Sequence, residues 1–293
     1  MQATHASEQA GSLSNFHFKL SAEQRRLVGD VRAVVQGEFK PRGEQFMNGA
    51  FPWPNIRKLA EMGILGMAVP KAYGGMELGV FETALVLEEI AKGCYVTAMA
   101  VLGEVGTQTR IIATYAPESI KQRLLPGVAK GEHLLSICMT EPHAGTDVGA
   151  YKTNVFRKAG KLVLNGAKSL VSRAEEASAF VVFSRVDGQP GGEGIGCVLV
   201  DRNTVGLSHI SRSHSMGGEY LHTIEFENCE LAEENLLLGP GSLKKLLSAF
   251  NTQRCLNPAI SLGISEGAFA EALSYARSRK AFGRSIGEFQ GMR

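Results

Sequence analysis

The chain has 293 residues, of which 44% are hydrophobic and 20% are charged, and its formal net charge is +2. This composition is ordinary for a globular protein, and a charge so near zero argues against a dedicated nucleic-acid-binding protein. The apolar runs are far shorter than the ~18 residues of a membrane span. The five cysteines form no Cys-x-x-Cys pair, which favours reduced thiols in the cytoplasm and argues against a metal site.

The N-terminal segment differs in composition from the rest of the chain. Residues 1–20 are polar, lack Arg and include Glu8, so they fit neither a secretory signal nor an Arg-rich transit peptide. We expect a flexible tail there. Residues 21–132 then show the spacing of apolar residues that is typical of helices, and we expect them to form an all-α domain.

Capping and stop signals predict the first helices. The segment Ser21-Ala-Glu-Gln24 fits a capping box, in which Ser caps the helix and Gln reaches back. Pro41 is expected to end the helix that begins there. A second helix is expected from Pro54 to Met62, with Gly63 as its C-terminal stop.

The middle of the chain has the pattern of β-strands. Residues 133–238 contain short β-rich runs bounded by Gly, Pro, Asn and Asp, which predicts a β-domain with a long hairpin loop at 188–196. The expected strands include Lys161–Gly166, Ala179–Ser184, Gly196–Val200 and His222–Glu227. Residues 239–293 return to helical spacing as far as Arg279, and we expect an incomplete helical domain.

The most informative segment is Cys138-Met-Thr-Glu-Pro-His-Ala-Gly-Thr-Asp-Val-Gly149, which follows the apolar run Leu134–Cys138. A strand that enters such a turn places backbone N–H groups and hydroxyls at one spot, which suits an anionic or heteroaromatic ligand. The chain has no Gly-x-Gly-x-x-Gly and no Walker-type motif, so neither a Rossmann site nor a P-loop is indicated.

This segment closely resembles a signature of the acyl-CoA dehydrogenases, FAD enzymes that oxidise fatty and branched acyl-CoA thioesters. The resemblance covers nearly the whole chain after residue 20. Other matching segments are Val69–Gly75, Glu88–Ile90, Leu164–Lys168, Phe226–Leu231 and Tyr275–Gly283 followed by Phe289-Gln290. The resemblance implies an α+β fold with an N-terminal helical domain, a middle β-domain (barrel or sandwich) and the start of a C-terminal helical bundle.

The resemblance also implies a cofactor, partners and site residues. The cofactor is FAD, the substrate an acyl-CoA, the electron acceptor an electron-transfer flavoprotein, and the complete protein a homodimer or homotetramer. Ser172 takes the place of the hydroxyl that bonds flavin N5, and Leu170 stands where many relatives have Trp. The other flavin contacts are assigned to Ile137, Cys138, Met139, Thr140, Gly145, Thr146 and Val171.

Two further groups are assigned by the same resemblance. Arg279, Phe282, Phe289 and Gln290 reach the pyrophosphate and adenosine side of FAD in a neighbouring subunit. On the long helix, Asn251 and Arg254 lie three residues apart and therefore on one face, which is expected to contact CoA together with Thr146 near the thioester.

The family reaction passes an α-proton to a carboxylate and a β-hydride to flavin N5, and no base is evident here. In most relatives that Glu lies near the C-terminus, so we expect it beyond Arg293, in a longer protein of which this chain is a truncated part. The alternative family position holds Gln253, whose amide cannot accept the proton. The chain alone is expected to be poorly active or inactive.

Two other functions fit the same resemblance. One is an acyl-CoA oxidase or a flavin-dependent monooxygenase of the same fold. The other is a partner subunit without catalytic activity that binds flavin or an acyl group. Oxygen consumption would distinguish an oxidase from a dehydrogenase, and a stable complex with a catalytic relative would mark a partner subunit.

Overall fold

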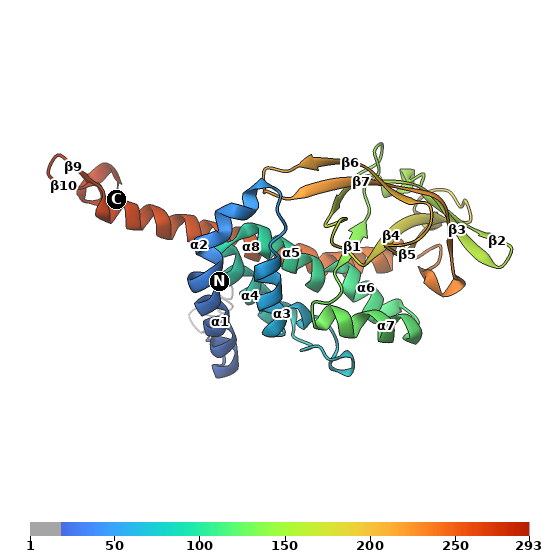
Figure 1. The fold of residues 1–293 in the computed structure, drawn as a ribbon, viewed down its shortest axis with the longest axis horizontal. Coiled ribbons are helices and arrows are strands. Elements are labelled where there is room, and N and C mark those ends of the chain that lie inside the picture. Colours follow the sequence, from blue (N-terminus) through green and yellow to red (C-terminus); the bar gives the residue numbers. More distant parts are fainter. Residues whose placement is uncertain (1–18, 293) are drawn as a thin grey trace, which may run out of the picture.

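The computed structural model describes residues 19–292, so the tail expected at residues 1–20 lies outside the described residues except for Lys19 and Leu20. Helices occupy the middle of the molecule, and the strands of the large sheet gather at one end (Figure 1). The last turns of the longest helix extend beyond the other helices at the opposite end (Figure 1). The order of helices, sheet and helix agrees with the expected α+β fold.

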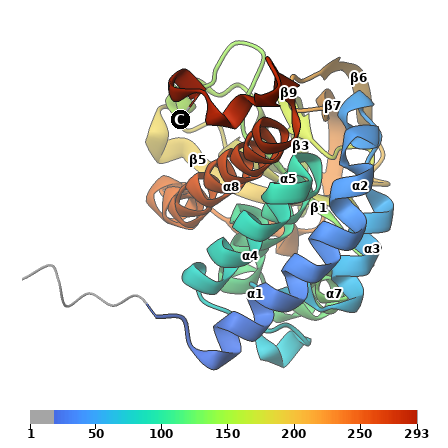
Figure 2. The same cartoon turned by 90° about the vertical axis from the view of Figure 1, so that its left-hand side faces the viewer.

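The N-terminal part is helical, as the spacing of apolar residues predicted. Its core is formed by apolar side chains such as Val31, Phe39, Leu59 and Leu87, all fully buried. Figure 2 shows α4 and α5 lying between α1 and the long helix α8. The helices of this part are α1 (Ala22–Val34), α2 (Lys40–Arg42), α3 (Trp53–Glu61), α4 (Val80–Gly93), α5 (Tyr95–Val105), α6 (Thr107–Tyr115) and α7 (Glu118–Ala129).

The predicted capping box is confirmed. The Ser21 hydroxyl accepts a hydrogen bond from the Gln24 N–H at 3.0 Å, and the Gln24 amide oxygen accepts one from the Ser21 N–H at 2.8 Å. The stop expected at Gly63 is also confirmed, because α3 ends at Glu61 and Gly63 has a φ of 75°.

The end predicted at Pro41 is wrong. The chain continues from α1 through a π-helical turn, Val35–Phe39, into α2, where Pro41 lies in the first turn. Proline is favoured at the first positions of a helix, because its fixed φ of about −65° matches the helical backbone. The helical path ends only at Gly49, whose φ is 91°.

Strands β1 to β8 form one eight-stranded sheet with the order β6-β7-β3-β2-β4-β5-β8, and β1 pairs in parallel with β4. The hairpin predicted around residues 188–196 is confirmed, since β4 and β5 pair antiparallel on either side of it. The strands are β1 (Leu135–Cys138), β2 (Asn154–Lys158), β3 (Lys161–Ser172), β4 (Ala179–Val186), β5 (Ile195–Asp201), β6 (Leu207–His214), β7 (Tyr220–Leu231) and β8 (Leu236–Leu238).

The long helix α8 (Leu243–Ser278) joins the sheet to the N-terminal helices and then leaves them. Its first half buries Leu246, Leu256 and Ile260 in the cores, whereas Phe269 is 69% exposed. The short strands β9 (Lys280–Ala281) and β10 (Arg284–Ser285) follow it. Within residues 19–292, no helix combines the length and the apolar character needed to cross a membrane.

Candidate flavin and acyl-CoA site

The signature segment is a tight turn at the end of β1. The backbones of Glu141 and Ala144 are hydrogen-bonded to each other, and the Glu141 N–H donates to the Ala144 carbonyl at 2.9 Å. Glu141 is buried, whereas Gly145 and Thr146 are exposed. The turn therefore directs its carboxylate inward and leaves its glycine and threonine open to a ligand.

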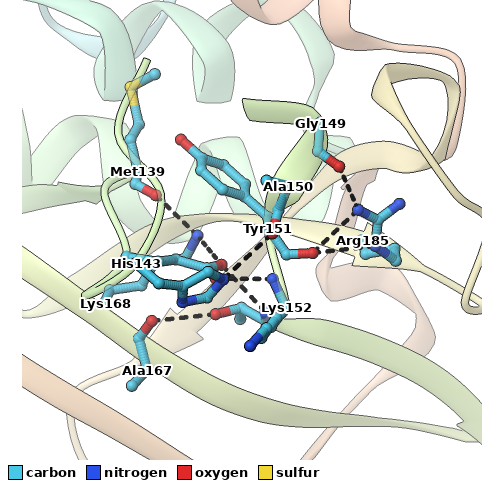
Figure 3. Close-up of polar contacts among 11 residues, drawn as sticks. Met139, His143, Gly149, Ala150, Tyr151, Lys152, Ala167, Lys168 and Arg185 are labelled. Carbon is cyan, nitrogen blue, oxygen red and sulfur yellow. Dashed lines mark hydrogen bonds and ion pairs between the residues drawn. The ribbon is translucent and has the colours of Figure 1, made fainter. Parts of the chain in front are cut away.

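A buried ion pair fixes this turn. The Lys168 ammonium, on β3, donates to Glu141 Oε1 at 2.9 Å and to the Met139 carbonyl at 2.8 Å, and it lies 3.8 Å from the centre of the Tyr151 ring (Figure 3). Glu141 Oε2 accepts the Lys152 N–H at 2.7 Å. Both charged side chains are almost completely buried.

The protonation of this pair follows from burial and charge. Burial lowers the pKa of Lys168 to about 8, although Glu141 opposes that change. Burial alone would raise the pKa of Glu141, but Lys168 and the N–H donors outweigh it and bring the pKa below its usual range. Glu141 is thus an ionised, hydrogen-bonded carboxylate, which suits a structural role better than that of a base.

The second predicted flavin segment lies directly beside this turn. The Ser169 N–H donates to the Thr140 carbonyl at 2.8 Å. The pairing of β3 with β7 is irregular between Lys168 and Val171, and there Leu170 adopts a φ of 56° and is 60% exposed. The structure therefore brings residues 137–146 and 170–172 together around an exposed apolar side chain.

Burial restricts how some of these residues could contact a cofactor. The side chains of Cys138 and Val171 are buried in the core of the sheet, so only their backbone atoms are available. Burial also raises the pKa of the Cys138 thiol well above its usual range. Ile137, Met139, Thr140 and Ser172 are half-buried.

A second buried ion pair lies immediately after Ser172. Arg173 is buried with a φ of 57°, and its guanidinium pairs with Glu104 of α5 and donates to the Ala100 carbonyl at 3.0 Å. Glu104 also accepts the Leu135 N–H at 3.2 Å. Burial raises the pKa of Glu104 to about 7, against the effect of Arg173. This pair connects the helical part to β1 and β3 beside the candidate site.

The residues predicted to contact FAD in a neighbouring subunit lie away from this turn. Arg279, Phe282, Phe289 and Gln290 follow the end of α8, at the opposite end of the molecule from β1 and β3 (Figure 1). Phe282 is 97% exposed, and its ring centre lies 6.2 Å from that of Phe289. This chain by itself does not bring these residues to the turn and Leu170.

The predicted CoA contacts lie on the first half of α8. Arg254 donates to the Asn251 amide oxygen at 3.4 Å, and both side chains are exposed, so they share one face as expected. The Gln253 amide oxygen instead accepts the Thr107 N–H at 3.2 Å and the Thr107 hydroxyl at 2.8 Å. Gln253 therefore caps the start of α6.

Two parts of this site were not predicted from the sequence. Lys168 was given no role, because β3 also carries Lys161, Asn165 and two serines, and nothing in that pattern marks this lysine as buried. Arg173 and Glu104 were not recognised either, because they lie on separate elements and are joined only in the folded chain.

Family models match three parts of the chain: the acyl-CoA dehydrogenase N-terminal domain at 21–132, the middle domain at 136–229 and the C-terminal domain at 243–293. The chain belongs to the acyl-CoA dehydrogenase family. It is 31% identical over 279 residues to the short-chain-specific acyl-CoA dehydrogenase of Clostridium acetobutylicum, covering 94% of this chain and 74% of that protein. It is 32% identical over 289 residues to a 3-sulfinopropanoyl-CoA desulfinase of Cupriavidus necator, covering 94% of this chain and 72% of that protein.

Solved structures agree with this assignment. A glutaryl-CoA dehydrogenase in complex with glutaryl-CoA has a TM-score of 0.88 and 28% identity, covering 94% of this chain and 71% of that chain. The prolyl acyl carrier protein oxidase AnaB has a TM-score of 0.83 and 26% identity, covering 93% of this chain and 74% of that chain. This acyl-CoA dehydrogenase family member is an oxidoreductase acting on CH–CH groups, and its cofactor is FAD.

The residues at the turn fit such a cofactor. Leu170 offers an exposed apolar surface for a flat ring system, in a left-handed conformation that strains a leucine. The hydroxyls of Thr140, Thr146 and Ser172, which are not fully buried, can bond polar edges of such a ring. These are the features that a heteroaromatic cofactor requires of its binding surface.

Proposed function

We propose that this protein catalyses α,β-dehydrogenation of an acyl-CoA thioester, with the α-proton going to a carboxylate base and the β-hydride to flavin N5. FAD supplies the two-electron acceptor for this oxidation. The proposal is carried by one observation: the Ser169–Thr140 hydrogen bond holds the signature turn against the exposed Leu170. Family membership supports the reaction type.

The residues of the chain have distinct roles in this proposal. Leu170 supports the ring, and Ser172 bonds the N5 edge. Thr146 lies near the thioester, where a hydroxyl donor lowers the cost of developing enolate charge. Asn251 and Arg254 bind the CoA portion, because Arg can hold a phosphate with two parallel hydrogen bonds.

The base comes from outside residues 19–292 in this proposal. The Gln253 amide is too weak a base to accept the α-proton, and its oxygen already accepts a hydrogen bond from Thr107. Glu141 is committed to Lys168 in a buried pair. Neither side chain is therefore available to take the α-proton.

We also propose a homodimer or homotetramer in which Arg279, Phe282, Phe289 and Gln290 bind the FAD of a neighbouring subunit. Support comes from their position away from the turn (Figure 1) and from apolar side chains that are exposed on the last half of α8. An electron-transfer flavoprotein is the proposed acceptor. A cytoplasmic location is supported by the five cysteines, all of which are free thiols.

The test is an anaerobic titration with butyryl-CoA of the FAD-reconstituted protein in a form that includes the proposed base beyond Arg293, followed by the yellow absorbance of the flavin. A dehydrogenase of this kind loses that colour in the titration and regains it when an electron-transfer flavoprotein is added. Retention of colour with short, long and branched acyl-CoA probes, in protein that carries its full complement of FAD, would reject the proposed reaction.

A second candidate is an oxidase of the same fold. The structural likeness to the prolyl acyl carrier protein oxidase AnaB supports this second candidate. An oxidase would consume oxygen with each thioester turned over. A dehydrogenase would consume little oxygen and depend on the flavoprotein acceptor, so an oxygen electrode separates the two.

A further inference from the structure

A pocket lies between α6, α8 and the segment 68–78. It measures about 380 Å³, which is within the range of small-molecule sites. Its lining residues Arg110 and Ala113 share one face of α6, because they are three residues apart. Ser248 and Thr252 are four residues apart and share one face of α8. Two helices that pack against each other therefore hold the polar groups of this pocket in place.

The Arg110 guanidinium has no partner among residues 19–292. Arg110 as a whole is half-buried, but its Nε and Nη2 atoms are fully buried and form no hydrogen bond with these residues. Burial lowers the pKa of the guanidinium, and no charged neighbour in this range raises it. The half-buried Arg185, by contrast, donates to the carbonyls of Gly149 at 2.7 Å and Tyr151 at 3.1 Å. Buried polar groups of native proteins are nearly always paired, so Arg110 requires an acceptor from elsewhere.

The other polar groups of the pocket are hydroxyls and one carboxylate. The hydroxyls, which can donate hydrogen bonds, belong to Thr114, Tyr115, Ser248 and Thr252. Glu77 is the one carboxylate among the described lining residues, and it accepts the Lys71 N–H at 3.4 Å. Lys245 adds a positive charge nearby, since its ammonium lies 5.9 Å from the centre of the Tyr115 ring. Arg110 and Lys245 together outweigh the charge of Glu77, which favours an anion in this pocket.

The rest of the wall is apolar. It is formed by Ala68, Pro70, Leu78, Ala113 and Ala249. We propose that this pocket binds a short aliphatic carboxylate, with its head group on the Arg110 guanidinium and its carbon chain against the apolar wall. The planar fork of a guanidinium matches a carboxylate through two parallel hydrogen bonds. A phosphate with two negative charges would be repelled more strongly by Glu77.

This pocket is distinct from the proposed CoA contacts. Arg254 follows Thr252 by two residues, which turns it by about 200° around the helix to the opposite side of α8. Arg110 lies one turn after Thr107, and Thr252 directly precedes Gln253. A ligand in the pocket therefore joins α6 to α8 beside the Thr107–Gln253 hydrogen bond and strengthens the contact between the two helices.

The test is isothermal titration calorimetry of the FAD-loaded protein with sodium propionate, at an ionic strength held constant with sodium chloride. Arg110→Met keeps an apolar stem but removes the cation, so propionate should bind at least roughly tenfold more weakly. Glu77→Gln removes the carboxylate from the wall, so propionate should bind roughly two- to fivefold more tightly. The second variant decides the matter even if Arg110→Met fails to fold.

Two controls separate a binding site from a general attraction of anions. Lys245→Gln removes the same charge beside the pocket but leaves every lining side chain in place, so the affinity for propionate should change by less than roughly threefold. Propionamide has the shape of propionate without its charge, so it should bind at least roughly tenfold more weakly than propionate.

A stability measurement gives an independent readout. Without propionate, Arg110→Met should be no less stable to urea than wild type, because the substitution removes a buried cation that lacks a partner. Propionate should raise the urea midpoint of wild type and leave that of Arg110→Met unchanged, because a bound ligand stabilises the folded state. A large loss of stability in Arg110→Met without propionate would show that the guanidinium already has a partner, and would overturn the proposal.

Several binding results would also overturn the proposal. Wild-type affinity in Arg110→Met, unchanged affinity in Glu77→Gln, or a loss in Lys245→Gln equal to that in Arg110→Met would each do so. Tighter binding of inorganic phosphate than of propionate would reject a carboxylate site. If wild type binds propionate no better than propionamide, water alone satisfies the guanidinium and the pocket is not an anion site.

Discussion

Replacing Lys168 by Met tests whether the buried ion pair holds the signature turn. The substitution keeps the length of the side chain but removes the ammonium that bonds Glu141 and the Met139 carbonyl. Glu141 would then be a buried carboxylate without its cation. The Met139 carbonyl would lose its donor, so the turn that carries Thr140 should also loosen.

The expected size of the effect follows from burial. Both charges are almost completely excluded from water, and breaking such a pair typically costs about 3–5 kcal/mol of unfolding free energy. Adding Glu141→Gln to Lys168→Met should restore part of this loss, because no unpaired charge then remains. The loss of the contact between the ammonium and the Tyr151 ring remains in both variants.

Urea unfolding followed by far-UV circular dichroism measures these differences. Lys161→Met is the matched control on the same strand, since the Lys161–Glu230 pair is exposed on both sides and should change stability far less. The reasoning would be refuted if Lys168→Met cost no more than Lys161→Met, or if the double variant were no more stable than Lys168→Met alone.

Three other predictions concern helix ends and the second ion pair. Burial raises the pKa of Glu104 from 4.5 to about 7, so the folded state binds the proton of this carboxyl more tightly than the unfolded chain does. The contribution of Glu104 to the free energy of unfolding therefore falls as the pH rises from 4.5 to about 7. A pH series of urea midpoints should show this fall in wild type and not in Glu104→Gln; equal slopes would contradict it. Gln253→Ala removes the acceptor that caps α6 and should lower the free energy of unfolding by about 0.5–2 kcal/mol, measured by thermal unfolding. Gln253→Glu keeps an acceptor, so its stability should stay near that of wild type. Similar losses of stability in both variants would disprove the cap. A Cβ at Gly103 would collide with the Arg173 guanidinium, so Gly103→Ala should lower the unfolding free energy by about 1–3 kcal/mol, and a neutral result would show that Arg173 is free to move.

Features set by neighbouring residues could be predicted from the sequence. The capping box at Ser21 and the stop at Gly63 depend on residues a few positions apart, and both were found as expected. The hairpin around residues 188–196 was predicted from glycines between two β-rich runs. Pro41 was misinterpreted because a proline in a first helical turn has the same local sequence as a proline that ends a helix.

Features that depend on the folded chain could not be predicted in this way. Lys168 lies 27 residues from Glu141, and Arg173 lies 69 residues from Glu104. A lysine or arginine has the same local pattern whether it meets a partner inside or remains in solvent. The exposed, left-handed Leu170 likewise results from an irregular β3–β7 pairing that the sequence of one strand does not specify.

Binding of FAD to Leu170→Asp tests the location of the cofactor most directly. Aspartate accepts a left-handed backbone better than leucine does, so the fold should tolerate the change, while a carboxylate replaces the apolar surface under the ring. Phe156→Asp is the control, because Phe156 is also exposed and apolar on the same sheet. We predict an affinity for FAD at least roughly tenfold weaker in Leu170→Asp, equivalent to about 1.4 kcal/mol, and an unchanged affinity in Phe156→Asp. Wild-type affinity in Leu170→Asp would contradict a flavin site at this turn.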